Sequence, residues 1–227
     1  MDINSDVGEF RSMIEDGTQE ALMPYITSAN IACCGHAGDE QTMRITVEQA
    51  RRHGVGIGAH PGYPDRENFG RLELEMPLAA VEATVYEQIC ALAAIAPDIV
   101  HVKPHGALYN QAVKNKPLAA AIARGVARYR RDVVLMGLAG SPMLDVFREE
   151  GFRVLAEAFA DRRYESDGTL RSRKYPDALI QDPIEAAAQA VRIAEKGQAQ
   201  TICIHSDTPG SVAIARAVSQ ALKGMKQ

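Results

Sequence analysis

The stretch His101–Asn110, HVKPHGALYN, is the most informative part of this sequence for both fold and site. The β-branched residues within 99–102 favour a strand, and Pro104 ends its ladder pairing because proline has no N–H to donate. Side chains alternate along a strand, so the two histidines and the lysine of this stretch share one face. Imidazoles and an ammonium are costly to bury against an apolar layer. We therefore expect the strand to leave a core and to deliver Lys103 and His105 into a polar pocket.

The two histidines of this stretch are predicted to have different roles. His105 lies beyond Pro104 and next to Gly106, a residue that lets the backbone come close to a neighbouring group. His101 lies about 13 Å further back along the strand, at a depth where the inside of a barrel is filled by packed side chains. We therefore expect His105 to take part in chemistry and His101 to stabilise the fold.

Length and composition favour one large core. The chain has 227 residues, 46% of them hydrophobic, and a net charge of −4, which indicates a single α/β domain over residues 1–227. Mild acidity gives no reason to expect nucleic acid or a membrane surface as partner. No apolar run approaches the ~20 residues that cross a bilayer, and no signal peptide is visible, so a cytoplasmic protein is expected. Four cysteines without framework or zinc-ribbon spacing fit reduced thiols.

Strand and helix patterns alternate along the whole chain, which predicts a parallel sheet with helical crossovers. A helix is expected from Asp39, as its N-cap, to about His53. Three later helices are each predicted to start at a capping residue followed by proline: Ser141-Pro142, Asp182-Pro183 and Thr208-Pro209. The predicted strands are 1–6, 26–32, 55–59, 99–102, 133–137, 152–159 and 201–205.

Acidic and imidazole side chains recur at the ends of these strands. Sites in parallel α/β folds gather at the carboxyl ends of strands, so these side chains are expected to meet. They belong to Asp6, His36, His60, His105, Asp161 and His205.

Two kinds of chemistry remain open for this set. The side chains can hold a divalent metal that activates water, or they can act as general acid and base around a substrate. No HExxH motif and no closed set of cysteine and histidine ligands is visible, so a tightly bound structural zinc is not expected. Lys103 would act as an electrophile or hold an anion in either case. Arg162-Arg163 is either a solvated pair or a carboxylate-binding pair. No GxxxxGK[ST] loop is present.

Six blocks along the chain resemble the LamB/YcsF family. The resemblance implies an irregular (β/α) barrel of about seven strands, similar to the glycoside hydrolase and deacetylase fold. It also implies an ATP-dependent hydrolase of cyclic amides, a 5-oxoprolinase, which opens the lactam 5-oxo-L-proline to L-glutamate. The chain would be the A subunit of this enzyme, with subunits B and C as its partners. The blocks are 2–9 (DINSDVGE), 28–39 (SANIACCGHAGD), 54–65 (GVGIGAHPGYPD), 101–110, 159–173 (FADRRYESDGTLRSR) and 202–209 (ICIHSDTP).

The resemblance also implies which residues form the site. The cofactors implied for the complex are ATP and Mg²⁺, whereas the resemblance leaves open a bound catalytic metal and homo-oligomerisation. The implied catalytic residues are Asp6, His36, His60, Lys103 and His105, and the implied substrate-binding residues are Asn30, Asp39, Asp161, Arg162 and His205.

Two other functions are compatible with the sequence. One is a metal-dependent deacetylase or amidohydrolase that works alone, and the other is a non-catalytic lactam-binding subunit. The chain also departs from the family pattern at Cys34-Gly35 and at Ser206, close to the expected site, and in the short segment between Gly197 and Thr201. The first two departures allow an altered substrate preference.

Overall fold

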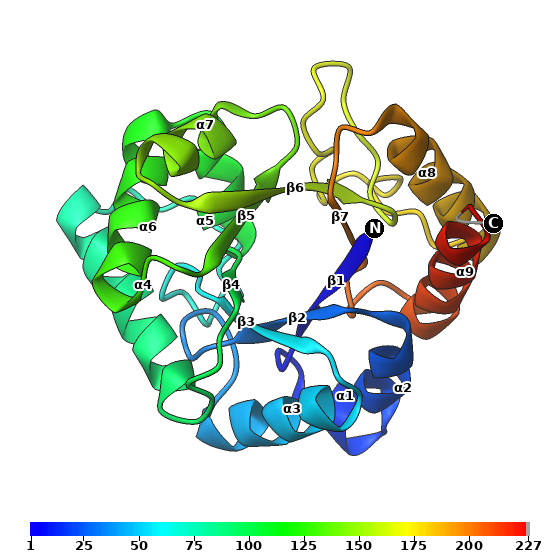
Figure 1. The fold of residues 1–227 in the computed structure, drawn as a ribbon, viewed down its shortest axis with the longest axis horizontal. Coiled ribbons are helices and arrows are strands. Elements are labelled where there is room, and N and C mark those ends of the chain that lie inside the picture. Colours follow the sequence, from blue (N-terminus) through cyan, green and yellow to red (C-terminus); the bar gives the residue numbers. More distant parts are fainter. Residues whose placement is uncertain (226–227) are drawn as a thin grey trace.

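Seven parallel strands close into a barrel in the computed structural model, which describes residues 1–225 (Figure 1). The first and last strands pair, with Asp2 opposite Thr201, and this pairing closes the ring. The predicted α/β barrel is thus confirmed, and each predicted strand overlaps an observed one. The strands are β1 (Asp2–Val7), β2 (Ser28–Ala32), β3 (Gly56–His60), β4 (His101–Val102), β5 (Val134–Leu138), β6 (Arg153–Phe159) and β7 (Thr201–Cys203).

Helices surround the barrel and bury the outer faces of its strands (Figure 1). The helices α4 and α6 pack against each other on one side, and α8 and α9 on another. The helices are α1 (Arg11–Glu15), α2 (Thr18–Leu22), the 3₁₀ turn η1 (Met23–Tyr25), α3 (Glu40–Arg52), α4 (Leu78–Ala93), α5 (Gly106–Ala112), α6 (Lys116–Tyr129), α7 (Pro142–Glu149), α8 (Pro183–Lys196) and α9 (Ser211–Gly224).

Helix starts were predicted with mixed success. Asp39 caps α3 as expected: its side chain accepts from the Thr42 N–H at 2.8 Å. Asp182 likewise accepts from the first turn of α8. The prediction for Thr208 was wrong, because α9 starts at Ser211 behind Gly210, and the Thr208 hydroxyl donates instead to a buried carboxylate. The short helices α1 and α5 were not predicted.

Polar side chains fill the inside of the barrel. On β1 the inward-facing Asp2, Asn4 and Asp6 alternate with Ile3, Ser5 and Val7, and these three polar side chains form hydrogen bonds inside the barrel. Asn4 donates to Thr201 at 2.8 Å, and Asn30 donates to Asn4 at 2.7 Å. The interior therefore positions charged groups instead of excluding them.

His101 belongs to this interior network. Its Nε2 lies 2.8 Å from Oδ1 of Asn30, and its side chain is buried. Gly58 on the next strand makes room for the ring, because a Cβ there would lie 1.9 Å from Nε2 of His101. These contacts agree with the expectation that His101 stabilises the fold.

Acid is expected to destabilise the protein through His101. Burial lowers the pKa of His101 to about 4, whereas an unfolded histidine has a pKa of about 6.5. Between pH 6.5 and about 4, His101 is therefore protonated in the unfolded chain but neutral in the folded chain. The free energy of unfolding decreases as the pH falls through this range. We expect a loss of roughly 2–3 kcal/mol, measured by urea unfolding across this range.

The variant His101→Gln provides the control for this prediction. Glutamine can donate to Asn30 but does not titrate, so the unfolding free energy of the variant should fall less steeply between pH 6.5 and 4. If the unfolding free energies of the two proteins fall equally steeply with pH, the acid sensitivity comes from groups other than His101.

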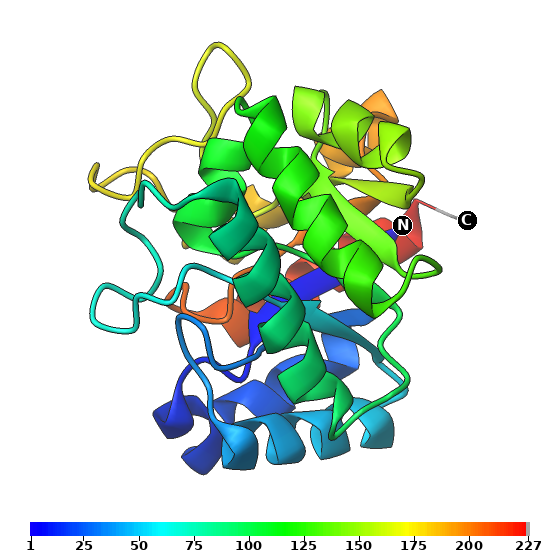
Figure 2. The same cartoon turned by 90° about the vertical axis from the view of Figure 1, so that its left-hand side faces the viewer.

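Long loops gather at one end of the barrel. The segments 61–77 and 160–182 connect β3 to α4 and β6 to α8, and both project on the left in Figure 2. The carboxyl ends of parallel strands all meet at one end of a barrel. The residues that follow the strands are therefore brought together there.

Candidate active site

A cavity of about 840 Å³ opens at the carboxyl ends of the strands. It lies between the barrel interior and the loops after β3, β6 and β7. Buried charged groups form its floor, and arginines and lysines line its rim. Its lining includes Asp6, Glu9, His60, Lys103, His105, Phe159, Arg162, Arg173, His205 and Asp207. The expected meeting of strand-end side chains is thus observed.

Lys103 binds two buried carboxylates at the bottom of the cavity. Its Nζ lies 3.0 Å from Oδ1 of Asp6 and 2.7 Å from Oε1 of Glu157, and it also contacts Asn4 at 3.1 Å. Burial alone would lower the pKa of Lys103, but the negative charges around it, Asp6 first, hold that pKa well above its usual value. An ammonium has three N–H donors, and its hydrogen bonds to Asn4, Asp6 and Sγ of Cys203 use them all. Lys103 therefore fixes carboxylates rather than offering a free donor to a substrate.

Asp6 stands between this lysine and the histidines. Its Oδ1 also accepts from Asn30 at 2.8 Å, whereas its Oδ2 lies 3.4 Å from Nε2 of His60. Burial would raise the pKa of Asp6, but His60 and Lys103 outweigh it and hold the pKa well below the usual range. The carboxylate is therefore ionised and faces the cavity.

Three imidazoles and Glu9 form a second cluster beside Asp6. His36 and His105 stack with ring centroids 3.5 Å apart, and His60 meets His105 edge-on. Burial lowers the pKa of His36 to about 3 and also lowers that of His105. For His60 burial acts the same way, but the charge of Asp6 reverses it and raises the pKa. The cluster therefore favours one positive charge near His60.

This cluster can hold a metal ion. Glu9, His36, His60 and His105 offer donor atoms that all lie within 4.8 Å of one another. Asp6, Cys203 and His205 form another such group, but burial raises the pKa of the Cys203 thiol far above neutral and disfavours the thiolate that a metal needs. Glu9 was not predicted as a site residue, although it follows β1 within the block 2–9.

Asp161 and His205 form a hydrogen-bonded pair. Nδ1 of His205 lies 3.0 Å from Oδ1 of Asp161, which is fully buried. The Thr208 hydroxyl and the His205 N–H also donate to the same carboxylate. Because a carboxylate accepts, Nδ1 carries the proton and Nε2 presents a lone pair 3.9 Å from Oδ2 of Asp6. This arrangement is suited to a general base.

Arginines form the opposite side of the cavity. Arg162 is 6% exposed, and the only hydrogen bond of its side chain among residues 1–225 runs from Nη2 to the carbonyl of Arg171 at 2.7 Å. Burial, and then the neighbouring charge of Arg173, lowers the pKa of Arg162 to about 10. Arg173 and Arg71 both bind Asp207. A guanidinium with unused donors beside a cavity is suited to bind a carboxylate or phosphate.

Four predicted site residues do not line this cavity, and one of them, Asp161, lies behind His205 and binds it. Asn30 lies below it and orients Asp6, and His36 lies behind His105 and contacts Glu9 at 2.9 Å. Asp39 is 48% exposed at its side chain, caps α3 and binds Arg11. The structure thus gives Asp39 a capping role away from the cavity, and its expected contact with substrate stays a prediction.

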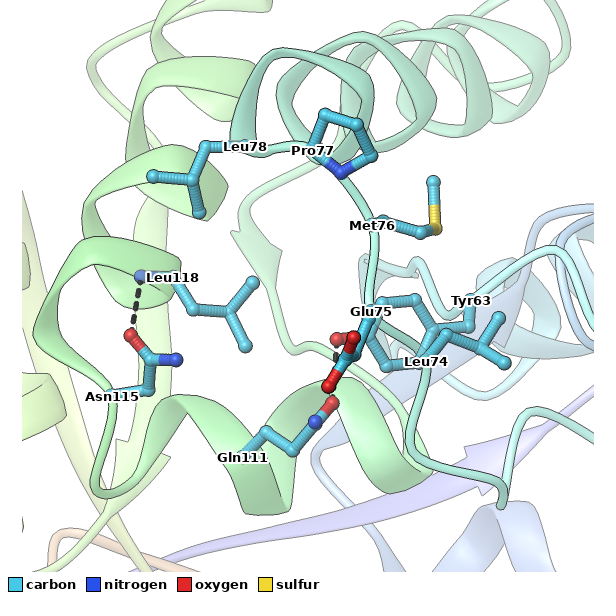
Figure 3. A pocket seen from close by; sticks show the side chains of 9 residues that line it. All are labelled: Tyr63, Leu74, Glu75, Met76, Pro77, Leu78, Gln111, Asn115 and Leu118. Atoms are coloured by element: carbon cyan, nitrogen blue, oxygen red, sulfur yellow. Dashed lines mark hydrogen bonds between the residues drawn. The ribbon is translucent and has the colours of Figure 1, made fainter.

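A second hollow of about 520 Å³ lies under the loop 66–77 (Figure 3). Leu78 and Leu118 border it on the helix side, and the Tyr63 hydroxyl donates to Gln111 at 2.6 Å. Glu75 is the only ionisable side chain among its lining apart from that tyrosine. The hollow has no acid–base cluster, and we do not place chemistry there.

The fold and this cavity define a class: a parallel (β/α) barrel with an acid, imidazole and guanidinium site at the carboxyl ends of its strands. Within that class the chain belongs to the LamB/YcsF family, whose model matches residues 1–227. The family resemblance noted from the sequence blocks is thus confirmed.

Several known proteins are similar over nearly the whole chain. The A subunit of 5-oxoprolinase from Chloroflexus aggregans is 49% identical, over 98% of this chain and 95% of its own length. The protein of the same name from Chloroflexus aurantiacus is 48% identical, over 98% and 94%. The crystal structure of a lactam utilization protein from Thermus thermophilus superposes with a TM-score of 0.91 at 37% identity, and covers 100% of this chain and 97% of that one.

No helix within residues 1–225 combines the length and the apolar character needed to span a bilayer.

Proposed function

We propose that this chain is the A subunit of an ATP-dependent 5-oxoprolinase, a cytoplasmic hydrolase that opens the lactam ring of 5-oxo-L-proline to L-glutamate. The supporting observation is the cavity at the carboxyl ends of the strands, whose lining includes both His205, which binds Asp161, and Arg162, whose guanidinium keeps unused donors. The chain is also 49% identical to a protein of that name. Subunits B and C are the proposed partners, and ATP with Mg²⁺ supplies the energy.

The chemistry explains why such a reaction needs ATP. A lactam carbonyl is a poor electrophile, and phosphorylation of its oxygen would turn that oxygen into a leaving group. Water then adds to the carbon, and the tetrahedral intermediate collapses with cleavage of the ring C–N bond, while the ring nitrogen takes up a proton. The acyl phosphate that results would be hydrolysed by a second water, which releases inorganic phosphate and leaves glutamate. In this proposal Nε2 of His205 takes the proton from water, and Asp161, which binds Nδ1, would stabilise the imidazolium that forms.

The arginines match the rest of the substrate. The α-carboxylate of 5-oxoproline is anionic, and Arg162 keeps donors that no described residue accepts, with Arg173 beside it. A guanidinium can bind a carboxylate through two parallel hydrogen bonds. We assign the carboxylate to Arg162, which leaves the lactam carbonyl directed towards His205 and Asp6.

Reconstitution tests this function. The purified chain with ATP, Mg²⁺ and 5-oxoproline should release little glutamate, and addition of subunits B and C should give glutamate and ADP in equal amounts. Glutamate release by the chain alone without ATP would instead indicate a stand-alone amidohydrolase. Undiminished kcat in a complex that carries His205→Gln, together with a raised KM in a complex that carries Arg162→Met, would indicate a subunit that only binds the lactam.

A further inference from the structure

The cluster of Glu9, His60 and His105 contains hydrogen-bond acceptors that face one another. Nδ1 of His60 lies 2.7 Å from the carbonyl oxygen of Lys103. A carbonyl oxygen only accepts, so Nδ1 carries the proton and donates it. In the neutral ring, Nε2 of His60 is therefore a bare lone pair, and it points into the cluster.

His105 is fixed in the opposite tautomer for the same reason. Its Nε2 lies 2.9 Å from the carbonyl oxygen of Phe69, so Nε2 donates and Nδ1 is bare. Nδ1 of His105 and Nε2 of His60 are only 3.0 Å apart. Two lone pairs at this distance repel each other unless a cation lies between them. Oε1 of Glu9 comes within 3.2 Å of Nδ1 of His105 and adds a third acceptor.

His36 holds the carboxylate of Glu9 in place. Its Nδ1 is buried and has no hydrogen-bond partner among the described residues. An N–H there would be unsatisfied, so the proton belongs on Nε2, which lies 2.9 Å from Oε1 of Glu9 and donates to it. His36 is thus a positioning residue, and the remaining acceptors converge from Glu9, His60 and His105.

We infer that Glu9, His60 and His105 bind a divalent transition-metal ion of the zinc type, with an open position towards the cavity. Two imidazole nitrogens and one carboxylate oxygen form a ligand set of catalytic zinc sites. Donors about 2.1 Å from a tetrahedral ion lie about 3.4 Å from one another. The observed separations among these three atoms are 3.0, 3.2 and 3.9 Å.

The surroundings of the cluster have the features of a metal site. Each histidine donates its other N–H to a backbone carbonyl, the outer contact that fixes a ligating imidazole in its tautomer. Oδ2 of Asp6 lies 3.4 Å from Nε2 of His60 and adds negative charge. Phe69, which supplies one carbonyl, has a φ of 56°, a strained value for a residue with a side chain. The loop is thus held in a costly conformation that orients His105.

Zn²⁺ and Co²⁺ titrations of the chelator-treated chain test the site. Calorimetry should show one Zn²⁺ bound per chain, and Co²⁺ should give the visible absorption bands of a tetrahedral or five-coordinate complex. Neither measurement includes substrate, ATP or the B and C subunits, so their failure would leave the proposed function untouched.

Three variants assign the ligands. His60→Ala should weaken Zn²⁺ binding by more than about 100-fold, beyond the range caused by loss of an outer hydrogen bond. Glu9→Gln should also weaken Zn²⁺ binding. Because this substitution keeps the shape of the side chain, it tests the site even if His60→Ala fails to fold. His53→Ala removes an imidazole at the C-terminal end of α3 and should leave the affinity unchanged. No uptake by the original chain, or equal affinity in all variants, would overturn the metal site and favour a proton shared by His60 and His105.

Discussion

Asp161→Asn is expected to lower the turnover of the reconstituted complex by about 10²–10⁴ with little change in KM, the range seen when a base loses its orienting carboxylate. The asparagine can still accept from the His205 N–H and from Thr208, so the fold is preserved. Its amide donates towards Nδ1 of His205, however, and this favours the tautomer with the proton on Nε2. That nitrogen can then no longer accept a proton from water.

Steady-state kinetics over pH 5–9 would check this prediction. The variant should lose most of the kcat of the original complex across this range, while its KM stays similar. His205→Gln should cost a similar factor, and the double variant should cost no more than either single one because the pair acts as a unit. Asp145→Asn, at an exposed ion pair on α7, is the matched control. A higher KM with an unchanged kcat would make Asp161 a substrate-binding residue instead.

The sequence predicted the framework of this site for a simple physical reason. Short apolar runs that end in a charged or imidazole residue mark strand ends, and a parallel barrel brings all such ends together. Asp6, His60, His105 and His205 could therefore be expected around one cavity before any pairing was known. The distinction between His101 and His105 likewise follows from their depth along one strand.

The pairings inside the site depend on contacts that no local pattern records. Asp161 and His205 come from loops 44 residues apart, and only closure of β6 against β7 brings them within 3.0 Å. Glu9 was overlooked because a lone acid after a glycine turn is common on protein surfaces. Lys103 was expected to hold a substrate anion. Its pairing with Glu157 was not predicted, because the sequence of β6 is mostly apolar and indicates an ordinary core strand.

The segment after Pro104 shows how tertiary contacts override a local interpretation. Gly106 was expected to let the backbone approach whatever His105 faces. It has a φ of 53°, and a Cβ would lie 2.6 Å from the carbonyl oxygen of Gly70, so the close approach is to the loop 66–77. The same carbonyl accepts from the Ala107 N–H at 2.9 Å. The loop thereby supports the start of α5, a helix too short to be recognised from its own periodicity.

Lys103→Met is expected to lower the free energy of unfolding at pH 7 by about 3–5 kcal/mol. The ammonium is 3% exposed and binds Asp6 and Glu157, whose side chains are 7% and 0% exposed. Removal of one partner from a buried ion pair leaves an uncompensated charge, and here two carboxylates are left facing one another. Methionine fills a similar volume, so the loss reports charge rather than a cavity. Urea unfolding followed by circular dichroism measures it.

The pH dependence of this loss separates charge from packing. Without Lys103, burial and mutual repulsion of the two carboxylates favour uptake of a proton by the pair, so the folded variant binds more protons than its unfolded state. Its stability should therefore rise as the pH falls from 7 towards 5, and Lys103→Met/Glu157→Gln should recover part of the loss at pH 7. Lys114→Met, which breaks the exposed pair with Asp167, should cost less than about 1 kcal/mol. The contrary outcomes are a loss of stability in Lys103→Met that stays constant with pH, or one that Glu157→Gln fails to reduce. Either result would show that the ammonium does not offset the cost of burying these two carboxylates.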